Sequence, residues 1–136
     1  MSDYLFAYGT LQPGFAPARI AALAAQMRPV GRGFVRGALY DLGRYAGAVS
    51  DPNSEGRISG TVMQLPDDQI FLRRLDAYEG FDPRAPEDSE YIRERHIVEL
   101  AEGGIRECWF YRYNRETDKT RAIANGVWTR RPGRTD

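Results

Sequence analysis

The chain has 136 residues, enough for one ordinary domain with its own hydrophobic core and too few for two. Its 19 Lys and Arg residues balance 19 Asp and Glu residues, so no net charge draws it to nucleic acid or to an anionic membrane. One cysteine and one histidine exclude an internal disulfide and a zinc site built from those ligands, and a hydrophobic fraction of 42% excludes intrinsic disorder.

The first half of the chain predicts a strand, a helix and then bent strands. Tyr4-Leu5-Phe6-Ala7-Tyr8 is aromatic and β-prone and stops at Gly9-Thr10, as a buried strand stops at a turn. Residues 18–27 carry apolar side chains at helical spacing, with Pro29 just beyond them. Between Val30 and Val49, five glycines interrupt β-prone residues, which is typical of the bent or bulged strands of a small barrel.

The second half predicts a strand, a helix and a hairpin. Residues 58–65 form the strand, and the helix opens at Pro66, is capped by Asp67 or Asp68 and ends near Gly80. After a loop at 81–90, residues 91–100 and 105–113 flank a Gly-Gly turn as a β-hairpin. We therefore expect one α+β domain over residues 1–136, with a frayed tail from about residue 130.

No targeting signal is expected. The amino-terminal residues lack a basic region followed by an apolar run, so they do not predict a signal peptide. No segment reaches the roughly 20 apolar residues that span a bilayer. A cytoplasmic protein without a membrane or nucleic-acid partner is the expectation.

Glu79 is the acid best suited to proton transfer. It stands at a predicted helix end, before Gly80 and between the aromatic residues Tyr78 and Phe81, where partial burial would raise its pKa. Asp76, on roughly the same helix face, is either a second acid or a helix charge. A solvated glutamate at a helix end is the common alternative for Glu79 on pattern alone.

The run Tyr8-Gly9-Thr10-Leu11 is the other candidate. A strand that enters such a turn presents backbone N–H groups, which can hold a carboxylate or the oxygen of a carbonyl under attack. An ordinary turn at a strand end is the competing interpretation. His96 is interpreted as a structural or surface residue and Cys108 as core packing. The alternating Trp109, Tyr111 and Tyr113 share one strand face, which packs in the core or lines a pocket.

Taken together, these pieces resemble the gamma-glutamylcyclotransferase-like family, in its short bacterial and gamma-glutamylamine-type branch. The resemblance runs from residue 4 to about residue 130. It departs from many relatives at one place, where this chain has Gly43-Arg44-Tyr45-Ala46-Gly47 and they have proline after the tyrosine, in a segment near their pocket. The matching runs, in order, are Tyr8-Gly9-Thr10-Leu11, Gly37-Ala38-Leu39-Tyr40-Asp41-Leu42, Gly60-Thr61-Val62, Leu75-Asp76-Ala77-Tyr78-Glu79-Gly80, Tyr91-Ile92-Arg93, Trp109-Phe110-Tyr111 and Ile123-Ala124-Asn125-Gly126-Val127-Trp128.

The resemblance implies a small mixed β-barrel of five or six strands with flanking helices. It implies that Tyr8, Gly9, Thr10 and Leu11 bind the substrate and that Glu79 is the catalytic acid/base. The implied reaction needs no cofactor or metal: the α-amino group of a small gamma-glutamyl compound attacks its own side-chain carbonyl, forming 5-oxoproline and releasing an amine or amino acid. Two alternatives stay open, a non-catalytic module that binds gamma-glutamyl ligands and removal of a gamma-glutamyl protecting group in specialised metabolism. The leaving amine and the oligomeric state also stay open.

Overall fold

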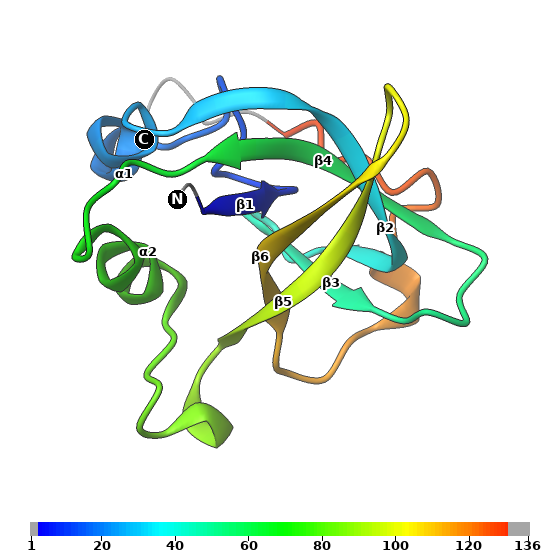
Figure 1. The fold of residues 1–136 in the computed structure, drawn as a ribbon. Helices are drawn as coiled ribbons and strands as arrows, with labels where there is room; N and C mark the ends of the chain where they lie inside the picture. The colour runs from blue at the N-terminus through cyan, green and yellow to red at the C-terminus, as the bar shows by residue number, and fades with distance from the viewer. Residues whose placement is uncertain (1–2, 131–136) are drawn as a thin grey trace.

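The computed structural model describes residues 3–130, in which five strands close into a barrel and a sixth lies at its edge (Figure 1). Neighbouring strands follow the order β3-β2-β4-β1-β6-β5, and β2 also pairs with β5, which closes the ring. The β1 and β6 strands are parallel and the other neighbours are antiparallel, so the expected small mixed barrel is confirmed. The strands are β1 (Tyr4–Ala7), β2 (Arg28–Asp41), β3 (Ala46–Ser50), β4 (Arg57–Gln64), β5 (Tyr91–Leu100) and β6 (Ile105–Tyr113).

The long strand β2 closes the barrel because it bends. Its register against β4 shifts between Pro29 and Gly31, which confirms the predicted bulge. At Gly33 the strand meets β5 as well, where it pairs with Leu100. A side chain at Gly33 would place its Cβ 2.7 Å from the Val98 side chain, so the absence of a side chain is what lets the two strands approach.

Two α-helices of the described residues, α1 (Ala18–Ala24) and α2 (Phe71–Glu79), lie on one side of the barrel (Figure 1). Strand β1 serves two cores because its side chains alternate: Phe6 lies in the barrel core, in contact with Phe110, whereas Leu5 and Ala7 lie in the core beneath the helices. No helix within residues 3–130 is long and apolar enough to cross a membrane. The core beneath the helices also holds Leu11, Ile20, Phe71, Leu75, Tyr91 and Tyr111.

The first helix is shorter than its pattern predicts. It ends at Ala24 rather than near Met27, because the chain must extend before Arg28 pairs with β4. Met27 is still buried, in the core beneath the helices, so the apolar spacing identified a core residue but not a helical one.

The second helix begins later than predicted and ends where predicted. It starts at Phe71, so neither Asp67 nor Asp68 is its cap, and Asp68 instead accepts a hydrogen bond from the Ile70 N–H in the preceding turn at 2.9 Å. Gly80 follows the last helical residue in the left-handed conformation, with φ of 69°.

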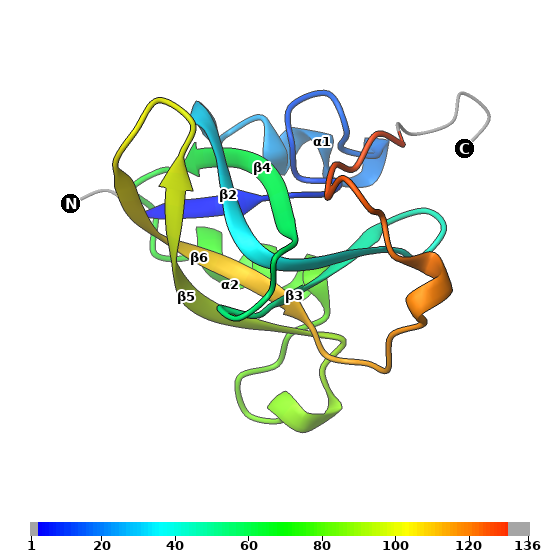
Figure 2. The ribbon, with the colours of Figure 1, turned by 90° about the vertical axis from the view of Figure 1, so that its right-hand side faces the viewer.

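The carboxyl-terminal segment packs across the end of the barrel. After β6 the chain passes a short 3₁₀ turn, η2 (Lys119–Arg121), and runs back toward α1 (Figure 2). Trp128 is buried in the barrel core, and Arg130 donates a hydrogen bond to Asp41 at 3.0 Å. The frayed tail expected from about residue 130 otherwise falls on residues 131–136, outside the described residues. A further 3₁₀ turn, η1 (Pro86–Asp88), lies in the loop before β5.

Candidate active site

A cavity of about 750 Å³ lies where the helices meet the barrel. Segments far apart in the chain line it: the turn after β1, the start of α1, the turn between β2 and β3, the end of α2 and the start of β5. Every residue that the sequence analysis assigned to a site lies on its wall, namely Tyr8, Gly9, Thr10, Leu11 and Glu79. The fold therefore brings the two predicted motifs to one place.

The buried side chain of Gln12 stabilises the β1 turn (residues 8–11) through hydrogen bonds to its backbone. The Gln12 amide donates to the carbonyl oxygens of Tyr8, at 3.0 Å, and of Gly9, at 3.3 Å. Among residues 3–130, no acceptor contacts the backbone N–H of Thr10 or that of Leu11. Both residues line the cavity. Unpaired N–H groups of a turn are the kind of donor that holds a carboxylate or a developing oxyanion.

Glu79 reaches the same cavity from the carboxyl end of α2. It is the last residue of the helix, which stops at Gly80. The neighbouring Tyr78 hydroxyl lies 2.7 Å from the Thr10 hydroxyl, so a side-chain hydrogen bond ties this end of α2 to the β1 turn. The end of α2 that carries Glu79 is thereby linked to the turn that carries these N–H groups.

The surroundings of Glu79 disfavour its charge. Its side chain is partly buried, and none of the described residues forms a hydrogen bond with its carboxyl group. Burial, together with the negative charges of Glu90 and Asp76, raises the pKa of Glu79 to about 8, although the positive charge of Arg19 opposes this rise. A carboxyl group of this kind takes up and gives back a proton near neutral pH, which is what general acid–base catalysis requires.

The aromatic residues around Glu79 are partly those predicted. Tyr78 lines the cavity, but Phe81 does not and lies instead near the Arg93 guanidinium. Three further rings interact with the charge of Glu79, and they come from the barrel strands and the β1 turn. They belong to Tyr8, Tyr91 and Tyr111, whose pKa values rise through burial and, with a smaller contribution, through the charge of Glu79.

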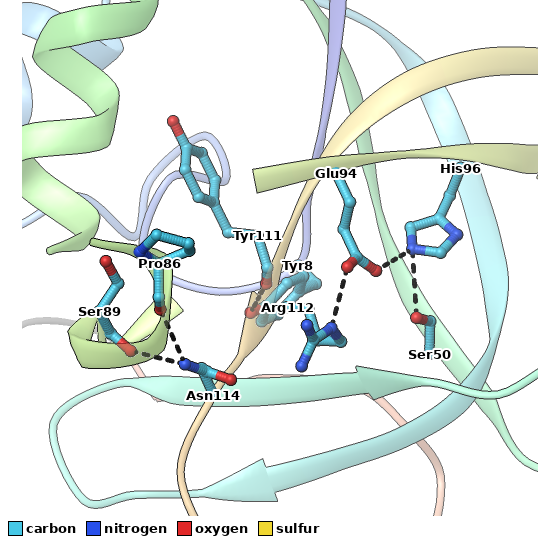
Figure 3. Close-up of polar contacts among 9 residues, drawn as sticks. All are labelled: Tyr8, Ser50, Pro86, Ser89, Glu94, His96, Tyr111, Arg112 and Asn114. Carbon is cyan, nitrogen blue, oxygen red and sulfur yellow. Dashed lines mark hydrogen bonds and ion pairs between the residues drawn. The ribbon is translucent and has the colours of Figure 1, made fainter. Parts of the chain in front are cut away.

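Two of these three tyrosines donate their hydroxyl groups to backbone carbonyl oxygens. The Tyr8 hydroxyl donates to the carbonyl oxygen of Tyr111 at 2.6 Å, as Figure 3 shows, and the Tyr91 hydroxyl donates to that of Ala46 at 2.7 Å. Their rings, rather than their hydroxyl groups, are therefore what these two tyrosines offer to a ligand.

Asp76, left open as a second acid or a helix charge, is neither. Its buried carboxylate accepts two hydrogen bonds from Arg93, at 2.8 and 3.2 Å, and one from the Tyr111 hydroxyl at 2.7 Å. The Arg93 guanidinium also stacks on Trp109, 4.2 Å from the ring centroid. Asp76 thus anchors α2 to β5 and β6. Tyr111 lines the cavity, whereas its alternating neighbours Trp109 and Tyr113 do not.

His96 and Cys108 are structural, as predicted. Figure 3 shows His96 between Ser50 and Glu94, a grouping that looks like a catalytic triad, yet one atom, His96 Nε2, contacts both the serine at 3.1 Å and the carboxylate at 2.6 Å. A triad needs the two partners on different ring nitrogens. Burial raises the pKa of Glu94, but hydrogen bonds from Arg112 and His96 outweigh it and hold that pKa below its ordinary value. Cys108 is buried, which raises its pKa to about 11 and keeps it a thiol.

Several cavity residues were not identified from the sequence. The segment at 43–47 does lie at the cavity, as the resemblance implied, and it contributes Arg44 and Tyr45. Arg19 from α1 and Glu90, the residue directly before β5, also line it. Glu90 falls in what was predicted to be a loop, and only its place directly before a strand distinguished it from the other acids of that loop.

Comparison with known proteins agrees with this architecture. The model of the family described as "Gamma-glutamyl cyclotransferase, AIG2-like" matches residues 5–130. No curated protein sequence matches the chain.

Several solved structures share the fold. YkqA from Bacillus subtilis is similar at 26% identity and a TM-score of 0.69, over 94% of this chain but only 40% of YkqA. An AIG2-like protein from Mus musculus is similar at 20% identity and a TM-score of 0.73, over 94% of this chain and 88% of the mouse chain. A structure described as a gamma-glutamyl cyclotransferase is similar at 17% identity and a TM-score of 0.57, over 83% of this chain and 67% of that one.

Proposed function

The chain belongs to the gamma-glutamyl cyclotransferase, AIG2-like family, and from that premise we propose that it converts a small gamma-glutamyl compound to 5-oxoproline and releases an amine or amino acid. One observation carries the proposal. A carboxyl group whose pKa is raised to about 8, that of Glu79, shares a cavity with two backbone N–H groups that have no acceptor among the described residues. Proton transfer and oxyanion stabilisation are the two tasks that the cyclisation sets.

The reaction is an exchange of one C–N bond for another. The α-ammonium group of the substrate first gives one proton to the Glu79 carboxylate, and the amine that results attacks its own γ-carbonyl carbon. Glu79 gives this proton to the leaving nitrogen as the tetrahedral intermediate collapses and the original amide bond breaks. The new ring nitrogen passes its extra proton through Glu79 to the released amine, so the carboxylate is restored. One carboxyl group serves as base and then as acid, and no water is consumed. The nucleophile belongs to the substrate, so the reaction requires neither a protein nucleophile nor a cofactor.

The β1 turn supplies the second part of the catalysis. The N–H groups of Thr10 and Leu11 are the donors that we assign to the substrate, either to its α-carboxylate or to the oxygen that becomes negative in the intermediate. Holding the glutamyl chain folded back on itself adds a further acceleration, because the attacking amine then no longer has to find the carbonyl.

A substrate panel tests the proposal. We expect the purified protein to release 5-oxoproline from at least one class among gamma-glutamyl amino acids, gamma-glutamyl amines and glutathione, measured by mass spectrometry with time. The class that reacts identifies the leaving group. A folded protein that releases none, yet gains melting temperature with these compounds, would be a binding module rather than an enzyme.

A further inference from the structure

The cavity holds a second carboxylate, that of Glu90. The backbone N–H of Glu90 donates to the Gly80 carbonyl at 3.1 Å, which fixes the start of β5 beside the end of α2. A Cβ placed on Gly80 would lie 3.8 Å from Glu90 Oε1, so this carboxylate stands next to the residue that follows Glu79. After burial, the charge of Glu90 is the largest cause of the raised pKa of Glu79.

The carboxyl groups of Glu90 and Glu79 differ in their hydrogen bonds. The Tyr45 hydroxyl donates to Glu90 Oε2 at 2.8 Å, and the negative charge on Glu90 raises the pKa of Tyr45 to about 12, chiefly through that hydrogen bond. Glu79 has no hydrogen-bonding partner in the described part of the chain. One carboxylate is thus fixed in place and the other is free to exchange a proton, a division that separates the roles of paired acids in other active sites.

The neighbouring carboxyl groups of Glu79 and Glu90 favour a positively charged group between them. Arg19, from α1, is the cation that acts on it, and its guanidinium already lies over the Tyr78 ring, 4.9 Å from the centroid. Arg44 and Arg130 line the same cavity. Two neighbouring carboxylates repel one another until a positive charge lies between them. The remaining groups that interact with Glu79 are Asp76 and Tyr78 on α2, Tyr8 in the β1 turn, Tyr91 on β5 and Tyr111 on β6.

We propose that Glu90, oriented by Tyr45, binds the α-ammonium group of the substrate and holds it against Glu79. The inference rests on the proposed function, in which that nitrogen must give its proton to Glu79 before it attacks. It makes the free α-amino group a requirement for binding as well as for reaction, and it gives Glu90 a role separate from that of Glu79.

A binding comparison tests the proposal without turnover. In a Glu79→Gln background, calorimetry measures the affinity for gamma-glutamylalanine and for glutarylalanine, which lacks only the α-amino group. We expect the amino compound to bind about 10-fold or more tightly, as a charge-assisted hydrogen bond would provide. Adding Glu90→Gln should abolish this preference, and adding Tyr45→Phe should reduce it. Two results would overturn the proposal. One is that the Glu79→Gln protein binds the two compounds equally well, and the other is that it still prefers the amino compound after Glu90→Gln is added.

The pH dependence provides a readout that a structural defect does not move. In the wild-type protein, kcat/KM should rise with pH through about 8, as the Glu79 carboxyl group loses its proton and becomes a base. Glu90→Gln removes a negative charge and should move this rise to lower pH. Arg19→Gln removes a positive charge and should move it to higher pH. Shifts in the same direction, or no shift in either variant, would contradict the assignment.

Failure of the proposed reaction and failure of the proposed role of Glu90 give different results. The proposed function fails if the wild-type protein releases no 5-oxoproline from the panel. The role of Glu90 fails if release occurs but the amino-group preference survives Glu90→Gln. Melting temperatures of the Glu90 and Tyr45 variants verify that each is folded.

Discussion

Replacing Glu79 with glutamine is expected to lower kcat for 5-oxoproline release by about 10²–10⁴-fold, the usual contribution of a general acid–base. The amide has nearly the shape of the carboxyl group but cannot take the proton from the attacking nitrogen or return one to the leaving nitrogen. Initial rates on the best compound of the panel measure the effect. Activity close to that of the wild type in a folded variant would remove Glu79 from the mechanism.

The stability of the same variant provides its control. Because the folded protein raises the pKa of Glu79 from 4.5 to about 8, the folded state holds this proton more tightly than the unfolded chain does. The stability that this contributes is fully present below pH 4.5 and is lost as the pH rises through about 8. Glu79→Gln has no such loss, so its melting temperature should match or exceed that of the wild type at pH 8 and above. A catalytic defect with unimpaired stability separates chemistry from folding.

Replacing Asp76 with alanine should lower the free energy of unfolding by about 3 kcal/mol or more, because it leaves the Arg93 guanidinium buried without its carboxylate partner. The two side chains are only 7% and 17% exposed, so water cannot replace the lost contact. The variant also loses the acceptor of the Tyr111 hydroxyl. Urea unfolding monitored by circular dichroism measures the change.

An exposed ion pair of nearly equal length is the matched control. Arg95 and Glu107 lie 2.9 Å apart, against 2.8 Å for Arg93 and Asp76, but both side chains are about half exposed. Glu107→Ala should therefore cost less than about 1 kcal/mol. Equal losses in the two variants would contradict the role of Asp76 as the residue that anchors α2 to β5 and β6.

The sequence predicted correctly those elements that depend on residues close to one another in the chain. The hairpin of β5 and β6 has the predicted bounds, because alternating side chains flank a Gly-Gly turn. Glu79 is the candidate acid by local pattern because Gly80 marks the end of its helix and the aromatic residues Tyr78 and Phe81 flank it. The predicted start of α2 was wrong, because Asp68 does not cap the helix. Its carboxylate accepts a hydrogen bond from the Ile70 N–H in the turn before the helix.

The missing predictions depended on contacts distant in sequence. Nothing near Asp76 shows that its partner is Arg93, 17 residues away on another element. Closure of the barrel depends on the pairing of Gly33 with Leu100, which no local pattern reports. Glu90 reaches the cavity because its backbone N–H donates a hydrogen bond to the Gly80 carbonyl. The sequence around a loop glutamate does not indicate such a contact.

The most direct test of the account is the fate of oxygen during turnover. The protein is incubated with its best panel compound in water labelled with heavy oxygen, and both products are quantified by mass spectrometry. Cyclisation predicts one molecule of unlabelled 5-oxoproline for each amine released, because the nucleophile is the substrate's own nitrogen. Release of labelled glutamate in place of 5-oxoproline would show that water attacks the carbonyl, and would contradict the proposed reaction.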